Sequence, residues 1–171
     1  MMRPLAMSAV LATLALAACD GPAPVPPPQE VSDSSVAQFC GMLVSEHEGP
    51  KGQIFVRGQS KPFWFASVND AVAFLRMEET PKNIVVVYVN DMARAHDWAH
   101  PEPGTWIDAK RAVYVIDSRK HGGMHGVEGA EAVPFGDRAA AQRFVAQNGG
   151  HMVTLAGIPD SVLHPDAESG S

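Results

Sequence analysis

The sequence predicts an α+β fold made of two similar ββαβ modules that form one compact domain. Two observations point to this fold: an internal repeat at an offset of 70 residues, and β-rich runs that flank each amphipathic helix of the repeat. The matching residues are Phe65, Ala71 and Phe74 in the first copy and Phe135, Ala141 and Phe144 in the second. The alternative is a coincidence, because two amphipathic helices that follow strands can produce the same match.

The first module contains two expected strands, a helix and a third strand. The two strands cover 53–57 and 62–65, and the third covers the strongly β-rich run 84–89. Ser67 is a typical N-cap and predicts that a helix begins directly after it. The apolar stripe of that helix consists of Val68, Ala71, Val72 and Leu75.

The second module repeats this order with weaker signals. Strands are expected at 112–117 and 130–135, and Asp137 is the expected helix N-cap. The run 148–150, Asn-Gly-Gly, is suited to the left-handed conformation that ends many helices. A weaker strand is expected at 152–155. The helix stripe consists of Ala140, Ala141, Phe144 and Val145.

Residues 1–18 have the pattern of a secretory signal peptide: one positive charge at Arg3, followed by an apolar run too short for a trusted membrane span. The run ends in Leu-Ala-Ala-Cys, which resembles the lipobox of bacterial lipoproteins. Cys19 is therefore the expected lipidation site of a periplasmic, membrane-anchored protein, and Asp20 favours the inner membrane. The alternative is an ordinary signal peptide with a cysteine near its end by chance.

The remaining chain divides by composition. Residues 19–36 read as a disordered, Pro-rich tether and residues 157–171 as a loose tail, which leaves a domain at 37–156 with halves at about 37–90 and 105–156. The 46% of apolar residues suffice for one packed core. The net charge of −6 argues against binding to nucleic acid or an anionic lipid surface.

The second cysteine, Cys40, has no partner if Cys19 is lipidated, and an unpaired thiol in an oxidising compartment points to a reactive or metal-binding group. If 38–44 is extended, Cys40 and Met42 share one face, because side chains alternate along a strand. Thiolate and thioether are soft ligands that select Cu(I). The alternative is a buried cysteine that acts as a small apolar residue.

A further ligand is expected from the glycine-rich segment 122–126, which carries Met124 and His125. In the offset of 70 this segment falls opposite 52–56, near the entry of the first module, which makes proximity to Cys40 plausible. The alternative for Met124 is a surface thioether in a hinge.

Three more histidines lie in positions of interest. His47 follows Cys40 closely and is either a ligand, a docking residue or part of a polar turn. His96 and His100 are four apart and would share a helix face, but Pro101 and Pro103 favour a solvated loop over a helical metal site.

These residues carry a resemblance to the NosL family, the lipoproteins that accompany nitrous oxide reductase in denitrification. The run 40–56, CGMLVSEHEGPKGQIFV, resembles the family signature, and the similarity spans roughly 39–150. Shorter similar pieces lie at 105–108, 112–115, 123–124 and 133–135. Two departures are the longer segments 125–129 and 91–103.

The resemblance implies a periplasmic copper chaperone that binds Cu(I) and passes it to apo nitrous oxide reductase during assembly of the copper-sulfide centre. It implies Cys40 as the thiolate ligand and Met124 as the loop thioether, with Met42 as a neighbour. Candidate ligands are therefore Cys40, Met124, Met42, His47 and His125. A homodimer of the apo form remains open.

Two other functions remain open. One is a thiol enzyme that uses Cys40 as nucleophile and His47 or His125 as base, although the sequence shows no nucleophile elbow. The other is a structural lipoprotein that only scaffolds assembly of the reductase. The sequence favours a binding module that performs no reaction on a substrate.

Overall fold

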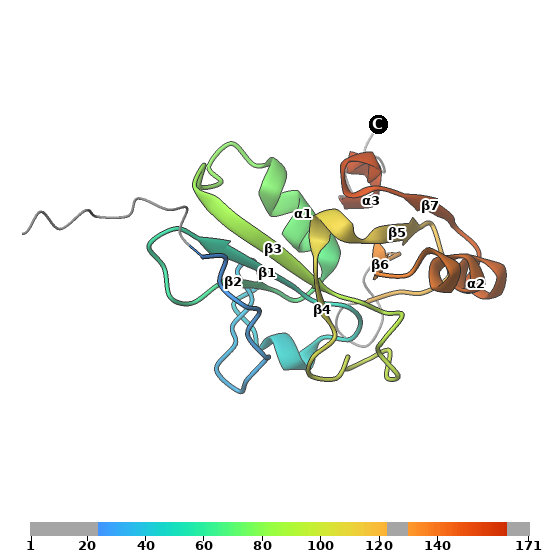
Figure 1. Cartoon of the computed structure of the whole chain (residues 1–171), viewed down its shortest axis with the longest axis horizontal. Helices are drawn as coiled ribbons and strands as arrows, with labels where there is room; N and C mark the ends of the chain where they lie inside the picture. The colour runs from blue at the N-terminus through green and yellow to red at the C-terminus, as the bar shows by residue number, and fades with distance from the viewer. Residues whose placement is uncertain (1–23, 123–129, 164–171) are drawn as a thin grey trace, which may run out of the picture.

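The computed structural model describes residues 24–122 and 130–163. In this part of the chain two antiparallel sheets lie side by side, with helices packed against them (Figure 1). The first sheet has the strand order β2-β1-β3-β4 and the second has the order β6-β5-β7. The first module comprises β1 (Gly52–Val56), β2 (Phe63–Phe65), α1 (Val68–Arg76), β3 (Ile84–Asn90) and β4 (Trp106–Asp108). The second comprises β5 (Val113–Ile116), β6 (Val133–Phe135), α2 (Arg138–Asn148) and β7 (His151–Val153).

The predicted ββαβ repeat is confirmed by the strand orders, since β2-β1-β3 and β6-β5-β7 are equivalent arrangements around one helix each. The repeat is not uniform in length. Gly52 faces Phe65, thirteen positions later, whereas Val113 faces Phe135, twenty-two positions later. The second module therefore has nine extra residues between its first two strands. The expectation that 122–126 is equivalent to 52–56 was wrong, because β5 is the equivalent of β1.

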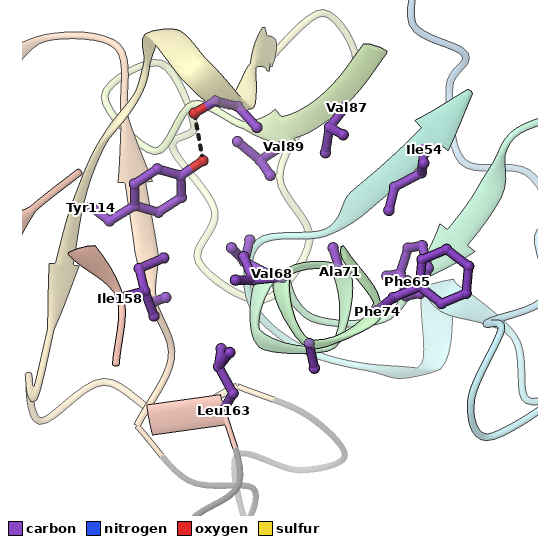
Figure 2. Packing of buried hydrophobic residues seen from close by; sticks show 14 of the residues in the cluster. Ile54, Phe65, Val68, Ala71, Phe74, Val87, Val89, Tyr114, Ile158 and Leu163 are labelled. Carbon is purple, nitrogen blue, oxygen red and sulfur yellow. Dashed lines mark hydrogen bonds between the residues drawn. The ribbon is translucent and has the colours of Figure 1, made fainter. Parts of the chain in front are cut away.

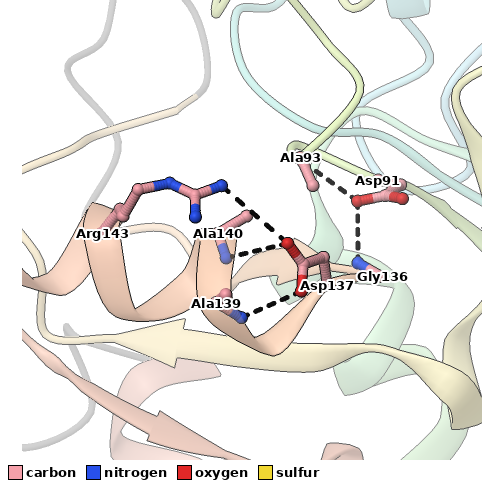
Figure 3. Close-up of polar contacts among 7 residues, drawn as sticks. All are labelled: Asp91, Ala93, Gly136, Asp137, Ala139, Ala140 and Arg143. Carbon is pink, nitrogen blue, oxygen red and sulfur yellow. Dashed lines mark hydrogen bonds and ion pairs between the residues drawn. The ribbon is translucent and has the colours of Figure 1, made fainter.

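Both predicted helix starts are confirmed. The Ser67 side chain accepts a hydrogen bond from the Asp70 amide, and the Asp137 side chain accepts from the amides of Ala139 and Ala140 (Figure 3). Gly149 ends α2 with a φ of 75° and a ψ of −165°, a region open to glycine that differs from the left-handed helical conformation expected for 148–150. Strand β4 was not predicted, because three residues carry too little alternation to be recognised.

One hydrophobic core is shared by both modules (Figure 2). Helix α1 covers the first sheet through Val68 and Ala71, and Tyr114 of β5 packs into the same cluster. Tyr114 is fully buried, and its hydroxyl donates to the Ala109 carbonyl at 2.8 Å, so its polar end is satisfied. Burial also raises the pKa of Tyr114.

A second connection between the modules runs through Asp91, directly after β3. Its carboxylate accepts hydrogen bonds from the amides of Ala93 and Gly136, at 3.0 and 2.7 Å (Figure 3). Gly136 precedes α2, so this carboxylate joins the end of the first sheet to the helix of the second module.

The prediction of a disordered tether over 19–36 was wrong for its described part. The Tyr88 hydroxyl donates to the Pro26 carbonyl at 2.9 Å, and the backbone of Gln29 pairs in both directions with the side-chain amide of the buried Gln53. The Glu30 carboxylate accepts from the Trp106 indole at 3.0 Å. The composition suggested a free chain, but these polar partners fix it on the first sheet. Cys19 and the signal peptide lie outside the described residues.

The prediction of a loose tail from residue 157 was also wrong as far as residue 163. Ile158 is 1% exposed, and Leu163 of α3 (Asp160–Leu163) is buried against the shared core. Arg76 of α1 bonds the Asp160 carboxylate and the Ile158 carbonyl. Two apolar anchors without regular spacing are enough to dock the segment, although they give no periodic signal. In the described residues no helix has the length and apolar character needed to cross a membrane.

Candidate metal centre

Cys40 lies at the tip of a tight hairpin. Val36 and Leu43 form an antiparallel bridge, and the Ala37 amide donates to the Met42 carbonyl at 2.8 Å. Gly41 has a φ of 69°, which turns the chain directly after Cys40. The expected extended strand over 38–44 is therefore wrong, and strand alternation no longer gives a reason for Cys40 and Met42 to share a face.

The hairpin is docked on the first sheet by aromatic contacts. The Phe39 ring centroid lies 5.7 Å from that of Phe65 and 6.2 Å from that of Phe74. The Gln38 amide donates to the Trp64 carbonyl at 2.8 Å. These contacts hold the backbone directly before Cys40, which is itself an exposed residue.

The imidazole of His47 faces this thiol. His47 follows the short 3-10 helix η1 (Val44–Glu46) and is 3% exposed. Its Nε2 atom lies 3.6 Å from Cys40 Sγ, within hydrogen-bonding distance for sulfur, and the tautomer of the ring decides which of the two atoms donates. An exposed soft sulfur is thus paired with a buried nitrogen that packing holds in place.

The spacing of these two atoms fits a metal ion. Bonds of about 2.3 Å to sulfur and 2.0 Å to nitrogen, as in zinc sites, would meet at an angle of roughly 113° if the two donor atoms are 3.6 Å apart. That angle lies between tetrahedral and trigonal values, so one or two further ligands are required. The described residues contain no cluster of three or more histidine, cysteine, aspartate or glutamate side chains that could hold an ion.

The turn that carries His47 is fixed by a buried lysine. The Lys51 ammonium, 4% exposed as a residue, donates to the carbonyls of His47 and Gly49 at 2.7 and 2.6 Å. The Lys51 amide donates to Asn90 Oδ1 at 2.7 Å, which ties the turn to the end of β3. Sequence reasoning missed this role, since a lysine next to a glycine-rich turn gives no sign of burial.

Met124 and His125 lie outside the described residues, but the residue that leads into their segment does not. Gly122 lies against the His47 turn: a methyl group added to Gly122 would lie 3.3 Å from the Glu48 carbonyl oxygen. A methyl group added to Gly49 would lie at the same distance from Gly122 Cα. The chain therefore enters 123–129 beside the residues that follow His47.

His96 and His100 are exposed in a loop, as the neighbouring prolines predicted. The Glu102 carboxylate accepts hydrogen bonds from the amides of His96 and Asp97, and these bonds lower the pKa of Glu102. The important side chain of this loop is Trp98, which sequence reasoning did not identify. Its indole donates to the His121 carbonyl at 3.3 Å, next to Gly122.

The fold and the site are those of a small α+β module with a thiol–imidazole pair at one edge, and comparison with known proteins gives its family. The family model described as NosL matches residues 28–163, so the chain belongs to the NosL family.

Three relatives illustrate the similarity. Copper-binding lipoprotein NosL of Achromobacter cycloclastes is 42% identical over 146 residues, which cover 84% of this chain and 74% of the relative. The protein of the same name from Stutzerimonas stutzeri is 30% identical over 141 residues, covering 82% and 70%. The crystal structure of the copper chaperone NosL from Shewanella denitrificans has a TM-score of 0.71 and 30% identity, and the match covers 80% of this chain and 99% of that chain.

Proposed function

We propose that this protein is a copper chaperone that binds Cu(I) through Cys40 and His47. The observation that carries the proposal is the 3.6 Å separation between the exposed thiol and the buried imidazole. A thiolate selects soft metals, and an imidazole suits copper. The names of the relatives, copper-binding lipoprotein and copper chaperone, agree with this chemistry and with a role other than catalysis.

The remaining ligands of the ion are expected among the methionine and histidine side chains that the sequence offered as candidates. Met124 is the proposed thioether ligand, and Met42 and His125 are the other candidates. The position of Gly122 against Glu48 supports a contribution from the segment after it.

The arrangement suits transfer of the ion by ligand displacement. His47 is held by burial and by the Lys51 ammonium, which bonds the His47 carbonyl, whereas Cys40 lies at the exposed tip of a hairpin. An acceptor can therefore approach the sulfur side while the nitrogen side stays fixed. We propose that the acceptor is apo nitrous oxide reductase, and that the metal-free chaperone can pair with a second copy.

The proposed location follows from the N-terminal pattern. Cys19 is the proposed lipid attachment site, which would anchor the protein in the periplasm, and Asp20 favours the inner membrane. Two or more acyl chains give stable anchoring where one does not.

Titration of the unlipidated domain with Cu(I) under reducing, anaerobic conditions tests the proposal. We expect uptake of about one equivalent with a thiolate-to-copper absorption band, since thiolate is a preferred Cu(I) ligand. Cys40→Ser should abolish the band, and His47→Ala should weaken binding. His96→Ala is the matched control, because that imidazole is exposed in a separate loop. Unchanged affinity in Cys40→Ser would contradict the proposal.

The same thiol–imidazole contact favours one other function, a thiol enzyme with His47 as base. Alkylation of the metal-free protein separates the two functions. A catalytic thiol reacts rapidly at neutral pH and slows strongly in His47→Ala, because it depends on a lowered pKa. A copper site predicts instead that Cu(I) protects Cys40 and raises the Tm, while a purely structural assembly factor predicts no effect of copper on Tm.

A further inference from the structure

The two modules meet at Gly122, beside the His47 turn. A methyl group at Gly122 would lie 2.5 Å from Glu131 Oε2 as well as 3.3 Å from the Glu48 carbonyl oxygen. The φ of Gly122 lies outside the left-handed range, so its backbone does not require glycine. A side chain at this position would instead have to displace these two neighbours.

The buried side of this contact is formed by Glu131, which is 2% exposed. Its Oε1 atom accepts hydrogen bonds from the amides of Val68 and Asn69, at 3.0 and 3.1 Å, at the start of α1. Its other oxygen faces Gly122. Burial raises the pKa of Glu131 to about 8, although the amides and the nearby Lys51 charge oppose this shift.

A second set of contacts at this place is formed by Trp98. Its indole N–H donates to the His121 carbonyl, and its ring lies 3.6 Å from the position of a methyl group on Gly49. The ring is stacked near Phe144 of α2, with centroids 6.4 Å apart, and Lys120 lies 5.1 Å above it. Trp98 thus contacts the His47 turn and the chain before Gly122 at once.

We propose that Glu131 and Trp98 are positioning residues for the copper site, which clamp His121 and Gly122 against the turn that carries His47. The clamp holds the turn that carries His47 in place against the second module. Lys51 completes it, because its ammonium bonds the His47 carbonyl and interacts with the Glu131 carboxyl. This inference rests on the proposed copper function and assigns residues that bind no metal themselves.

A purely structural role does not account for the arrangement. Capping of α1 uses only Oε1 of Glu131, which accepts from the Val68 and Asn69 amides while Ser67 accepts from Asp70, whereas Oε2 faces Gly122. Trp98 bonds the His121 carbonyl in addition to its stacking on Phe144. Outer residues that orient metal ligands commonly contribute 10- to 100-fold in affinity, so the effect is measurable.

The first test compares Glu131→Ala and Trp98→Ala with the native domain by competition of Cu(I) against a colorimetric chelator. Each variant should lose about tenfold in affinity or more. Glu131→Gln should recover most of the native affinity, because the amide keeps an oxygen for the helix amides and fills the same space. Ser67→Ala is the matched control: it weakens the same helix, so it should lower Tm while leaving the affinity unchanged.

A second test needs no copper. Hydrogen exchange at the Gly49 amide, which bonds the Ala99 carbonyl at 3.1 Å, reports directly on the clamped turn. Its exchange should accelerate in Trp98→Ala and Glu131→Ala and stay native in Ser67→Ala. If a truncation prevents folding, Gly122→Ala replaces it, because the added methyl separates the segments without removing core; Gly157→Ala, where a methyl makes only ordinary contacts, is its control.

The clamp is wrong if both alanine variants lose Tm as Ser67→Ala does and yet bind Cu(I) as tightly as the native domain. Failure of the native domain to bind Cu(I) would instead overturn the proposed function. In that case, native-like hydrogen exchange at the Gly49 amide in the variants would also contradict the clamp. Faster exchange would instead support a clamp that holds the His47 turn without a role in copper binding.

Discussion

At the scale of single residues, the site is built from one group that the sequence reveals and several that it hides. Cys40 was a candidate from the sequence, because an unpaired thiol is conspicuous in a chain with a signal-peptide pattern, and its role as a ligand stays a prediction. His47 was one candidate among several until its ring was found beside the thiol. Glu131 could not be found, because its contact with Val68 joins residues 63 positions apart. No local pattern marks such a pairing.

Glu131 predicts an unusual pH dependence of stability. Burial raises its folded pKa to about 8 from the ordinary value of 4.5, with Asp70 adding to this effect and Lys51 opposing it. The folded state therefore holds a proton that the unfolded chain releases, so stability should fall as pH rises from about 5 to 8, by up to about 1.4 kcal/mol per pH unit. Urea unfolding of the metal-free domain across this range measures the slope.

In Glu131→Gln the same slope should be largely removed, because the amide does not titrate. A native-like slope in this variant would assign the pH dependence to another group.

Gly41 predicts a local strain effect next to Cys40. Its φ is 69°, and a methyl group there would meet nothing within 4 Å, so only the backbone conformation resists substitution. Gly41→Ala should destabilise the domain by about 1 kcal/mol, and Gly41→Asn by less, because asparagine tolerates the left-handed region better. Equal stability of the two variants, measured by urea unfolding, would show that the hairpin adjusts freely.

At the scale of elements, the sequence predicts a helix or strand well where local interactions determine its structure. It predicts poorly where contacts with distant parts of the chain determine the structure. Ser67 and Asp137 begin their helices as expected, because a cap is a local interaction. The strand over 38–44 failed, because Gly41 and the bridge between Val36 and Leu43 form a hairpin instead. The second module has nine additional residues before β6, and the sequence did not reveal them. The offset of 70 holds only from β2 to the end of α1 and from β6 through α2, which lies after this insertion.

Helix α1 and strand β1 approach closely at one glycine, which gives a prediction about their packing. A methyl group at Gly52 would lie 2.6 Å from Ala71 Cβ. Gly52→Ala should cost about 1–3 kcal/mol through overpacking. Adding Ala71→Gly should recover part of the loss, reduced by about 1 kcal/mol for glycine within a helix. Thermal unfolding of the three proteins tests this coupling, and strictly additive losses would reject it.

At the scale of the whole molecule, the core extends beyond the two modules to the segment after β7. Ile158 and Leu163 are buried against residues of α1 and the sheets. The composition of this segment gave no sign of that docking, since two isolated apolar residues do not form a pattern. The sequence thus predicted the repeat and missed the flanking chain that closes around it.

Ile158 provides the test of this extended core. It is 1% exposed, so Ile158→Ala should reduce the free energy of unfolding by about 2–5 kcal/mol. Ala156→Gly, in an exposed position nearby, is a control that should have a much smaller effect. Similar small losses in both variants would show that the segment contributes little to the core.

The fixed chain ahead of the first sheet has a consequence for how far the candidate metal centre can lie from a lipid surface. The Tyr88 hydroxyl holds the Pro26 carbonyl, so only seven residue steps separate that bond from Cys19. Fully stretched, they span about 25 Å, against roughly 60 Å if all of 19–36 were free. With acyl chains at Cys19, the domain would stay within a thin layer next to the bilayer. A protein that accepts copper from it, as proposed, would then have to bind it close to the lipid surface.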